Sequence, residues 1–225
     1  MARAVIFDFD GVIADTEKVH LDAFRKILAP EGVEILEADY FEKYLALDDK
    51  NFFTTLLREN GRDAGAEKVA DFVKKKSLVT SEMLENCAFF EGALDLINSL
   101  AEARFPLAIA SGALRKEIES VLVRGGVADC FSFIASAEDC EKCKPAPEIF
   151  LYALKGLNSS STLSPPASAR ECVAIEDSSH GIAAAKAAGM KCVAVTNSHP
   201  AEALLSADLI TLSLREIDAE KIASF

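Results

Sequence analysis

The sequence has few basic residues relative to acidic ones. Of its 225 residues, 24 are Lys or Arg and 36 are Asp or Glu, which gives a formal net charge of −12. Phosphate backbones are bound by basic surfaces, so this charge disfavours nucleic acid as the main partner. It is compatible with a small phosphorylated ligand, because a bound cation and a few local lysines can reverse the field inside a cleft.

Long apolar runs and a targeting segment are also missing. No stretch approaches the roughly 18 apolar residues needed to span a bilayer. The N-terminal run meets the carboxylate of Asp8 before an apolar signal region can form. We therefore expect a cytoplasmic monomer that binds neither nucleic acid nor membrane.

Cysteine is present, but a second pair of metal ligands is not. Cys140 and Cys143 form a lone CxxC, and the remaining candidates are the scattered His180 and His199. Without a signal peptide, the six cysteines are expected to be free thiols. Zinc or redox chemistry at the CxxC is disfavoured for the same reasons.

The pattern of apolar residues predicts an α/β fold. Half the residues are hydrophobic and 27% are charged, as in a soluble globular protein. Short runs rich in Val, Ile and Phe alternate with helical spacing, which predicts a Rossmann-like parallel sheet covered by helices on both faces. The expected strands are 4–9, 106–110, 131–135, 172–175, 192–195 and 209–211, and the expected helices are 92–104, 114–124, 147–157 and 181–188.

One segment interrupts the alternation of strands and helices. From about Asp15 to Asn86 the sequence shows helical patterns and no strand pattern. We interpret residues 1–14 and 88–225 as the catalytic core and residues 15–87 as an inserted, all-helical cap domain. The run from Lys74 to Lys76 is expected to lie on a solvated helix face.

Two aspartates follow the first expected strand. Asp8 and Asp10 are two residues apart and fall on the same side of an extended chain. Carboxylates that close repel each other unless a cation or a shared proton intervenes. Magnesium suits the pair because it prefers oxygen ligands and commonly takes one or two carboxylates together with phosphate oxygens. A strand-end turn with helix-capping aspartates is the alternative at this point.

A second acidic pair, Glu176 and Asp177, follows the apolar run 172–175. In open parallel sheets, ligands bind outside the carboxyl ends of the strands. The two acidic pairs are therefore expected to converge on one cation.

Three further residues could bind a phosphate. Ser111 and Gly112 end the expected strand 106–110, where a hydroxyl and bare backbone N–H groups can donate to phosphate oxygens, although a simple helix cap would explain them too. Lys144 precedes the Pro-Ala-Pro segment and could neutralise a carboxylate or a phosphate oxygen. Position alone does not distinguish it from Lys142.

Taken together, these segments resemble the haloacid dehalogenase-like superfamily. Residues 8–12 (DFDGV) resemble its first motif, Ser111 its second, Lys144 its third, and residues 176–182 (EDSSHGI) its fourth. The helical insert after the first motif resembles the small cap of the branch that contains β-phosphoglucomutase and sugar-phosphate phosphatases.

The resemblance implies a magnesium-dependent phosphatase of a small phosphorylated metabolite, such as a sugar phosphate. Asp8 would attack phosphorus and form an aspartyl-phosphate. Asp10 would act as the general acid and base. Ser111 and Lys144 would bind the phosphoryl oxygens. By the same resemblance, the magnesium ligands are Asp8, Asp10, Glu176 and Asp177.

The resemblance leaves a phosphomutase open as the alternative. His20 follows the Asp15-Thr16 pair at the spacing of a β-phosphoglucomutase histidine that couples substrate binding to closure, although it could also be an exposed helix histidine. The mutase has a Lys-Gly pair and an arginine where this chain has residues 45–50 (LALDDK). Acidic residues there would repel a second phosphate, which favours the phosphatase. A non-catalytic phosphate-binding protein is a third hypothesis, disfavoured because both aspartates of the first motif are present.

Overall fold

The computed structural model describes residues 1–44, 47–160 and 163–225. The chain forms two compact units, one built from Met1–Asp15 and Ala88–Phe225 and the other from Thr16–Cys87. Within the described ranges, no helix is both long and apolar enough to cross a membrane.

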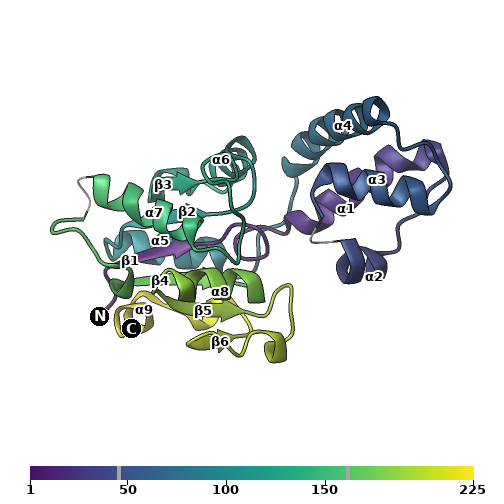
Figure 1. Ribbon diagram of the computed structural model, residues 1–225. Coiled ribbons are helices and arrows are strands. Elements are labelled where there is room, and N and C mark those ends of the chain that lie inside the picture. Colours follow the sequence, from purple (N-terminus) through teal and green to yellow (C-terminus); the bar gives the residue numbers. More distant parts are fainter. Residues whose placement is uncertain (45–46, 161–162) are drawn as a thin grey trace. The chain divides into compact units, whose positions relative to one another are not determined.

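The first unit is built on a six-stranded sheet in which every neighbouring pair is parallel (Figure 1). The strand order is β3-β2-β1-β4-β5-β6, so the order reverses between β1 and β4. The predicted α/β fold with a Rossmann-like parallel sheet is therefore confirmed. The strands are β1 (Ala4–Phe7), β2 (Leu107–Ala110), β3 (Phe131–Ala135), β4 (Cys172–Glu176), β5 (Lys191–Val195) and β6 (Leu209–Thr211).

Side chains of the central strands are buried on both faces, as expected for a parallel sheet covered by helices. All four residues of β1 have no exposed surface. Ala4 and Ile6 belong to the apolar cluster that includes α7 (Glu148–Ser159) and α8 (Ser179–Ala187). The other helices of this unit are α5 (Ala93–Glu102), α6 (Arg115–Arg124) and α9 (Ala219–Ala223).

The first strand ends two residues earlier than the sequence predicts. Phe9 lies beyond it, because the chain turns there and the amide of Ile13 donates to the carbonyl oxygen of Phe9 at 2.9 Å. Gly11 has φ +74°, a left-handed conformation that a residue with a side chain adopts only under strain. The turn places Asp8 and Asp10 at the carboxyl end of the sheet.

The two ends of the inserted segment are held side by side within the first unit. The amide of Asp15 donates to the carbonyl of Ala88 at 2.9 Å, and the amide of Phe90 donates to the carbonyl of Ile13 at 3.0 Å. Ala14 and Phe89 form an antiparallel bridge between these two bonds. The segments that precede and follow the helical unit are therefore joined to each other by backbone hydrogen bonds.

The second unit is helical and has its own aromatic core. The rings of Phe24 and Phe52 stack with centroids 3.8 Å apart, and Phe53 packs edge-on against Phe24 and Phe72. Aromatic contacts of this kind add to the free energy gained by burial. The helices are α1 (Thr16–Leu28), α2 (Glu37–Asp39), which continues as a π-helical turn (Tyr40–Tyr44), α3 (Asp49–Glu59) and α4 (Ala66–Leu84).

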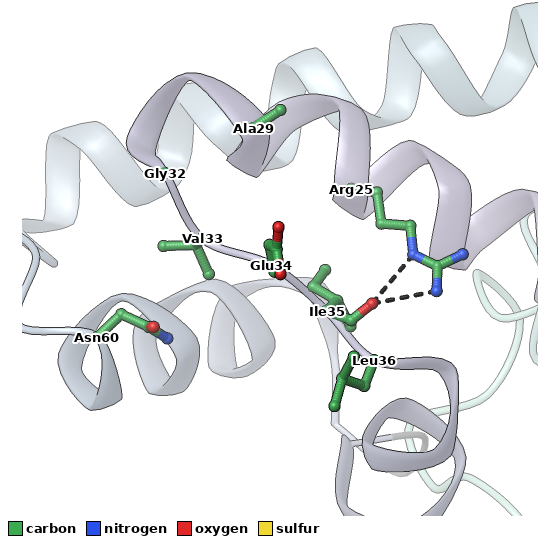
Figure 2. Close-up of a pocket in the computed structure, with 8 residues that line it drawn as sticks. All are labelled: Arg25, Ala29, Gly32, Val33, Glu34, Ile35, Leu36 and Asn60. Carbon is green, nitrogen blue, oxygen red and sulfur yellow. Dashed lines mark hydrogen bonds between the residues drawn. The ribbon is translucent and has the colours of Figure 1, made fainter.

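A pocket of about 690 Å³ lies beside the connection between α1 and α2 (Figure 2). Two charged residues, Arg25 and Glu34, line it, and the guanidinium of Arg25 donates two hydrogen bonds of 3.1 Å to the carbonyl oxygen of Ile35. None of the site residues predicted from the sequence lines it. This pocket therefore lies apart from the chemistry that the motifs predict.

Candidate functional site

Three buried carboxylates meet where β1 and β4 end. Asp8 follows β1, while Glu176 ends β4 and Asp177 follows it. Ligand oxygens of all three lie within 4.8 Å of one another. These two strands are neighbours at the point where the strand order reverses, which is where ligands bind in open α/β sheets.

Lys144 provides the positive charge next to this cluster. Its Nζ lies 2.8 Å from Oδ1 of Asp8 and 2.7 Å from Oε1 of Glu176. Lys142 instead lies on the surface, with 74% of its side chain exposed, and pairs with Glu148. The geometry therefore selects Lys144 over Lys142, a choice that the sequence left open.

Burial and mutual repulsion shift the ionisation of this cluster. Burial, followed by the neighbouring carboxylates Glu176, Asp177 and Asp10, raises the pKa of Asp8 well above its ordinary value, although Lys144 opposes the shift. Burial and Glu176 raise the pKa of Asp177 to about 7. Burial disfavours the charged form of Lys144, but Asp8 and Glu176 outweigh it and raise the pKa of that ammonium. The ionised forms of Asp8 and Asp177 are therefore disfavoured unless a further cation joins Lys144.

The local backbone holds Glu176 firmly. Its Oε2 accepts hydrogen bonds from the amides of Asp177 at 3.1 Å and Ser178 at 3.3 Å, and from the Ser178 hydroxyl at 3.1 Å. A Cβ at Gly181 would lie 1.8 Å from Oε1 of Glu176, so only glycine leaves room for this carboxylate. The fourth motif therefore supplies both the acidic pair and the space that it occupies.

Asp10 and Ser111 lie together at the adjoining strand ends. The hydroxyl of Ser111 donates to Oδ2 of Asp10 at 3.2 Å and accepts from the amide of Ala113 at 2.9 Å. Ser111 is fully buried, whereas Gly112 is exposed and a Cβ there would meet no atom within 4 Å. The backbone of Gly112 is thus accessible next to Ser111, as an anion-binding loop requires.

The buried carboxylates fit a hard divalent cation. Asp8, Glu176 and Asp177 carry three negative charges when ionised, and Lys144 is the cation that contacts Asp8 and Glu176. The available ligand atoms are carboxylate oxygens, the type that Mg²⁺ prefers. This buried cluster can therefore bind a metal, and its chemistry suits magnesium.

His20 belongs to the helical unit, where it contacts a second buried lysine. Nζ of Lys76 lies 2.7 Å from Nδ1 of His20 and 2.9 Å from Oδ1 of Asp49. His20 is partly buried, so the alternative of an exposed helix histidine is wrong. Burial, and secondarily the charge of Lys76, lowers the pKa of His20 to about 3, which keeps its imidazole neutral.

The expectation that residues 74–76 lie on a solvated face is wrong for Lys76. Lys74 and Lys75 are exposed, but Lys76 is only 4% exposed and its ammonium lies 4.7 Å from the centroid of the Phe24 ring. Its position is four residues after buried Phe72 and four before buried Thr80. The helical period therefore places it on the apolar face of α4.

The segment 45–50 gives less support to the repulsion argument than the sequence suggested. Residues 45 and 46 lie outside the described part of the chain. Asp48 caps α3 by accepting from the amide of Asn51 at 2.8 Å, and Asp49 pairs with Lys76. Both carboxylates thus have local partners that reduce their effect on a bound phosphate.

Two residues at the main site were not identified from the sequence. The side-chain amide of Asn197 donates to the carbonyl of Gly11 at 2.7 Å, and Ser198 hydrogen-bonds to Asp177. Both follow β5, whose carboxyl end lies at the same edge of the sheet as those of β1 and β4. That position was the available signal, but their uncharged side chains match no motif.

Comparison with known proteins identifies the family of the chain. A family model described as haloacid dehalogenase-like hydrolase matches residues 5–195. Protein CbbY of Rhodobacter capsulatus is 31% identical over 198 residues, which cover 85% of this chain and 84% of that protein. The phosphorylated carbohydrates phosphatase of Thermotoga maritima is 28% identical over 213 residues, 93% of each chain.

Among solved structures, β-phosphoglucomutase from Clostridium difficile superposes with a TM-score of 0.80 and 29% identity, covering 100% of this chain and 96% of that one. The family model, the relatives and the shared fold all agree with the family that the sequence motifs resemble. The chain belongs to the haloacid dehalogenase-like hydrolase family.

Proposed function

We propose that the protein is a magnesium-dependent phosphatase that hydrolyses a small phosphorylated metabolite, most simply a sugar phosphate, through an aspartyl-phosphate. The observation that carries the proposal is the buried cluster in which Lys144 contacts both Asp8 and Glu176, with Asp177 alongside. It combines a carboxylate nucleophile, a cation for the transferring phosphoryl group and a surplus of oxygen ligands.

In this proposal an oxygen of the Asp8 carboxylate attacks phosphorus, and the bond between phosphorus and the leaving oxygen breaks. Asp10 supplies a proton to that oxygen, so the first product departs as an alcohol. Water then attacks the aspartyl-phosphate, Asp10 accepts its proton, and inorganic phosphate is released as Asp8 is regenerated. The hydrogen bond from Ser111 to Asp10 supports this role by fixing the carboxyl group.

The remaining groups would bind the transferring phosphoryl oxygens. Lys144 is charged because two carboxylates stabilise its ammonium, and Gly112 offers an accessible backbone beside buried Ser111. The carboxylates of Asp8 and Asp177, with Glu176 in support and the carbonyl oxygen of Asp10, would hold Mg²⁺. When bound, the ion would offset the charge of the phosphate and of the carboxylates around it.

A phosphomutase is the second candidate, favoured by the similarity to β-phosphoglucomutase and by His20 on α1. The phosphatase is preferred because residues 45–50 lack the Lys-Gly pair and the arginine that the resemblance associates with a mutase. A relative whose name states that it removes phosphate from carbohydrates supports the same choice. The preference for the phosphatase rests on the missing Lys-Gly pair and arginine more than on repulsion of a second phosphate by Asp48 and Asp49.

The deciding experiment measures phosphate release from a panel of sugar phosphates, with Mg²⁺ and with excess EDTA. In parallel, β-glucose 1-phosphate with its bisphosphate is assayed for conversion to glucose 6-phosphate. We expect magnesium-dependent phosphate release and little isomerisation. Isomerisation with negligible release would make the protein a mutase, and binding of phosphate without turnover of any substrate would make it non-catalytic.

A further inference from the structure

A third strand end contributes to the site around Asp8. The strand β5 lies next to β4 and two positions from β1, and all three run in the same direction. The segment that follows it, Thr196–Ser198, is tied to β6 by a 3.1 Å hydrogen bond from the amide of Thr196 to the carbonyl of Thr211. This segment is called the β5 loop below. It reaches the turn after β1 although 186 residues separate Asn197 from Gly11.

Asn197 fixes the backbone of that turn. Its Nδ2 donates a 2.7 Å hydrogen bond to the carbonyl oxygen of Gly11. Gly11 directly follows Asp10, has a positive φ, and donates its own amide to the carbonyl of Ala14 at 3.1 Å. The peptide groups on both sides of Gly11 are therefore held, one by the turn itself and the other by the β5 loop.

Ser198 holds a second group beside Gly11, the carboxylate of Asp177. Its side chain hydrogen-bonds to the carboxylate of Asp177. A Cβ at Gly11 would lie 1.8 Å from Oδ2 of Asp177 and 2.6 Å from Oγ of Ser198. The carboxylate of Asp177 and the hydroxyl of Ser198 thus both lie against Gly11, where they leave no space for a side chain.

We propose that Asn197 and Ser198 are positioning residues that fix the Asp10-Gly11 turn and the Asp177 carboxylate in the arrangement that binds the divalent cation. This inference rests on the proposed function, because it assigns the β5 loop to the same metal site. Neither residue carries a charge, so neither adds to the electrostatic attraction of the ion. Their effect is to reduce the freedom of groups that would otherwise have to be ordered when the ion binds.

The test compares Asn197→Ala and Ser198→Ala with wild type. Ser198→Thr keeps the hydroxyl and serves as the conservative rescue. Ser206→Ala is the matched control, because Ser206 is an exposed serine in the same connection between β5 and β6. Binding of Mn²⁺ alone is measured by electron paramagnetic resonance, and thermal unfolding of the metal-free proteins verifies that each variant is folded.

We expect Asn197→Ala and Ser198→Ala to bind Mn²⁺ about 10- to 100-fold more weakly, the range found when partners of metal ligands are removed. The Mg²⁺ concentration for half-maximal phosphatase activity should rise in parallel. Ser198→Thr and Ser206→Ala should bind like wild type. A loss of Mn²⁺ affinity at unchanged melting temperature separates positioning from a general structural role.

Unchanged Mn²⁺ affinity in folded Asn197 and Ser198 variants would overturn the positioning role while leaving the phosphatase proposal intact. The same holds if the variants lose Mn²⁺ affinity only in proportion to a lowered melting temperature. Failure of wild type to bind Mn²⁺ or to release phosphate would instead overturn the proposed function, and the positioning role with it.

Discussion

Each unit of the molecule has a lysine whose side chain is largely enclosed, 14% exposed for Lys144 and 5% exposed for Lys76, and their surroundings differ. In the α/β unit, Lys144 contacts two carboxylates, Asp8 and Glu176. In the helical unit, Lys76 contacts one carboxylate, Asp49, and the imidazole of His20. The first cluster keeps a surplus of negative charge, whereas the second is balanced, with one positive group, one negative group and one neutral ring. Surplus negative charge must be compensated by a further cation or by bound protons, and balanced charge needs neither.

The comparison suggests different roles for the two clusters. A site that retains negative charge when its lysine is in place is suited to bind an ion and perform chemistry on phosphate. A balanced cluster beside an aromatic core is suited to hold polar groups in fixed positions. The predictions below test this difference, beginning with the largest expected effect.

Removing the nucleophile should have the largest effect. Asp8→Asn is expected to lower kcat by about 10⁴-fold or more, as loss of a covalent nucleophile does in other enzymes. Steady-state phosphate release measures the loss, and circular dichroism tests that the variant is folded. Appreciable residual turnover by a folded Asp8→Asn protein would refute the assignment of Asp8.

Removing the general acid should have an effect that depends on the leaving group. Asp10→Asn is expected to slow sugar phosphates by about 10²- to 10⁴-fold. An activated aryl phosphate should lose much less, because its leaving oxygen departs without a proton. The two substrate classes are compared through kcat/KM. Equal losses for both would show that Asp10 does not protonate the leaving group.

Replacing Lys144 and Lys76 in turn should show that the two clusters contribute differently to the free energy of unfolding. Without divalent cation, Lys144→Met is expected to lower the free energy of unfolding by about 3–5 kcal/mol, because buried carboxylates lose their partner. Lys76→Met should cost about 1–3 kcal/mol, since Asp49 is partly exposed and can be solvated. Urea unfolding measures both values.

Magnesium makes this comparison sharper. Adding Mg²⁺ should stabilise Lys76→Met only as much as wild type, because the variant keeps the carboxylates of the first cluster, and should stabilise Lys144→Met by more, because its unpaired carboxylates gain a cation. Lys142→Met is the matched control, since Lys142 is exposed two residues away and should lose little stability or activity. Equal magnesium responses in the two buried-lysine variants would contradict the comparison.

The smallest effect concerns the pH dependence of stability. The pKa of His20 is about 3 in the folded protein and about 6.5 in an unfolded chain, so between these values the unfolded state binds more protons. The stability associated with neutral His20 is therefore complete above pH 6.5 and is lost as the pH falls. Between pH 7 and 5 the loss amounts to as much as about 2 kcal/mol.

The variant His20→Gln isolates this contribution. Metal-free wild type should lose up to about 2 kcal/mol more than His20→Gln between pH 7 and 5, measured by urea unfolding. Asp177 acts in the opposite direction, because its raised pKa makes the folded state bind more protons as the pH falls. Its contribution is common to both proteins and cancels in the difference. Parallel pH profiles would show that His20 is not held neutral.

Much of the fold and part of the site could be predicted from the sequence. The parallel sheet was predictable because apolar runs such as 131–135 and 209–211 alternate with helical patterns, and both runs form strands with these bounds. The proximity of Asp8 to Asp177 followed from the rule that parallel strands end at one edge of the sheet. The catalytic roles given to these residues stay predictions.

The residues that escaped prediction did so for two different reasons. Lys76 was placed on a solvated face because a run of lysines usually is, although its spacing from Phe72 and Thr80 placed it on the buried face of α4. Asn197 and Ser198 act through hydrogen bonds to groups far away in the sequence. Such bonds leave no periodicity and no charge pattern. They depend on strand order, which becomes known only from the fold.

The short ladder formed by Ile13–Asp15 and Ala88–Phe90 has a consequence for exchanging parts of this protein. Because these two backbone segments are hydrogen-bonded to each other, the chain of the sheet-bearing unit is held together at the two positions where residues 16–87 are inserted. A tight turn, or a foreign helical module, could be grafted between Asp15 and Ala88 without breaking any hydrogen bond of the sheet. Exchanging that module would test whether the helical unit sets the selectivity for phosphate esters.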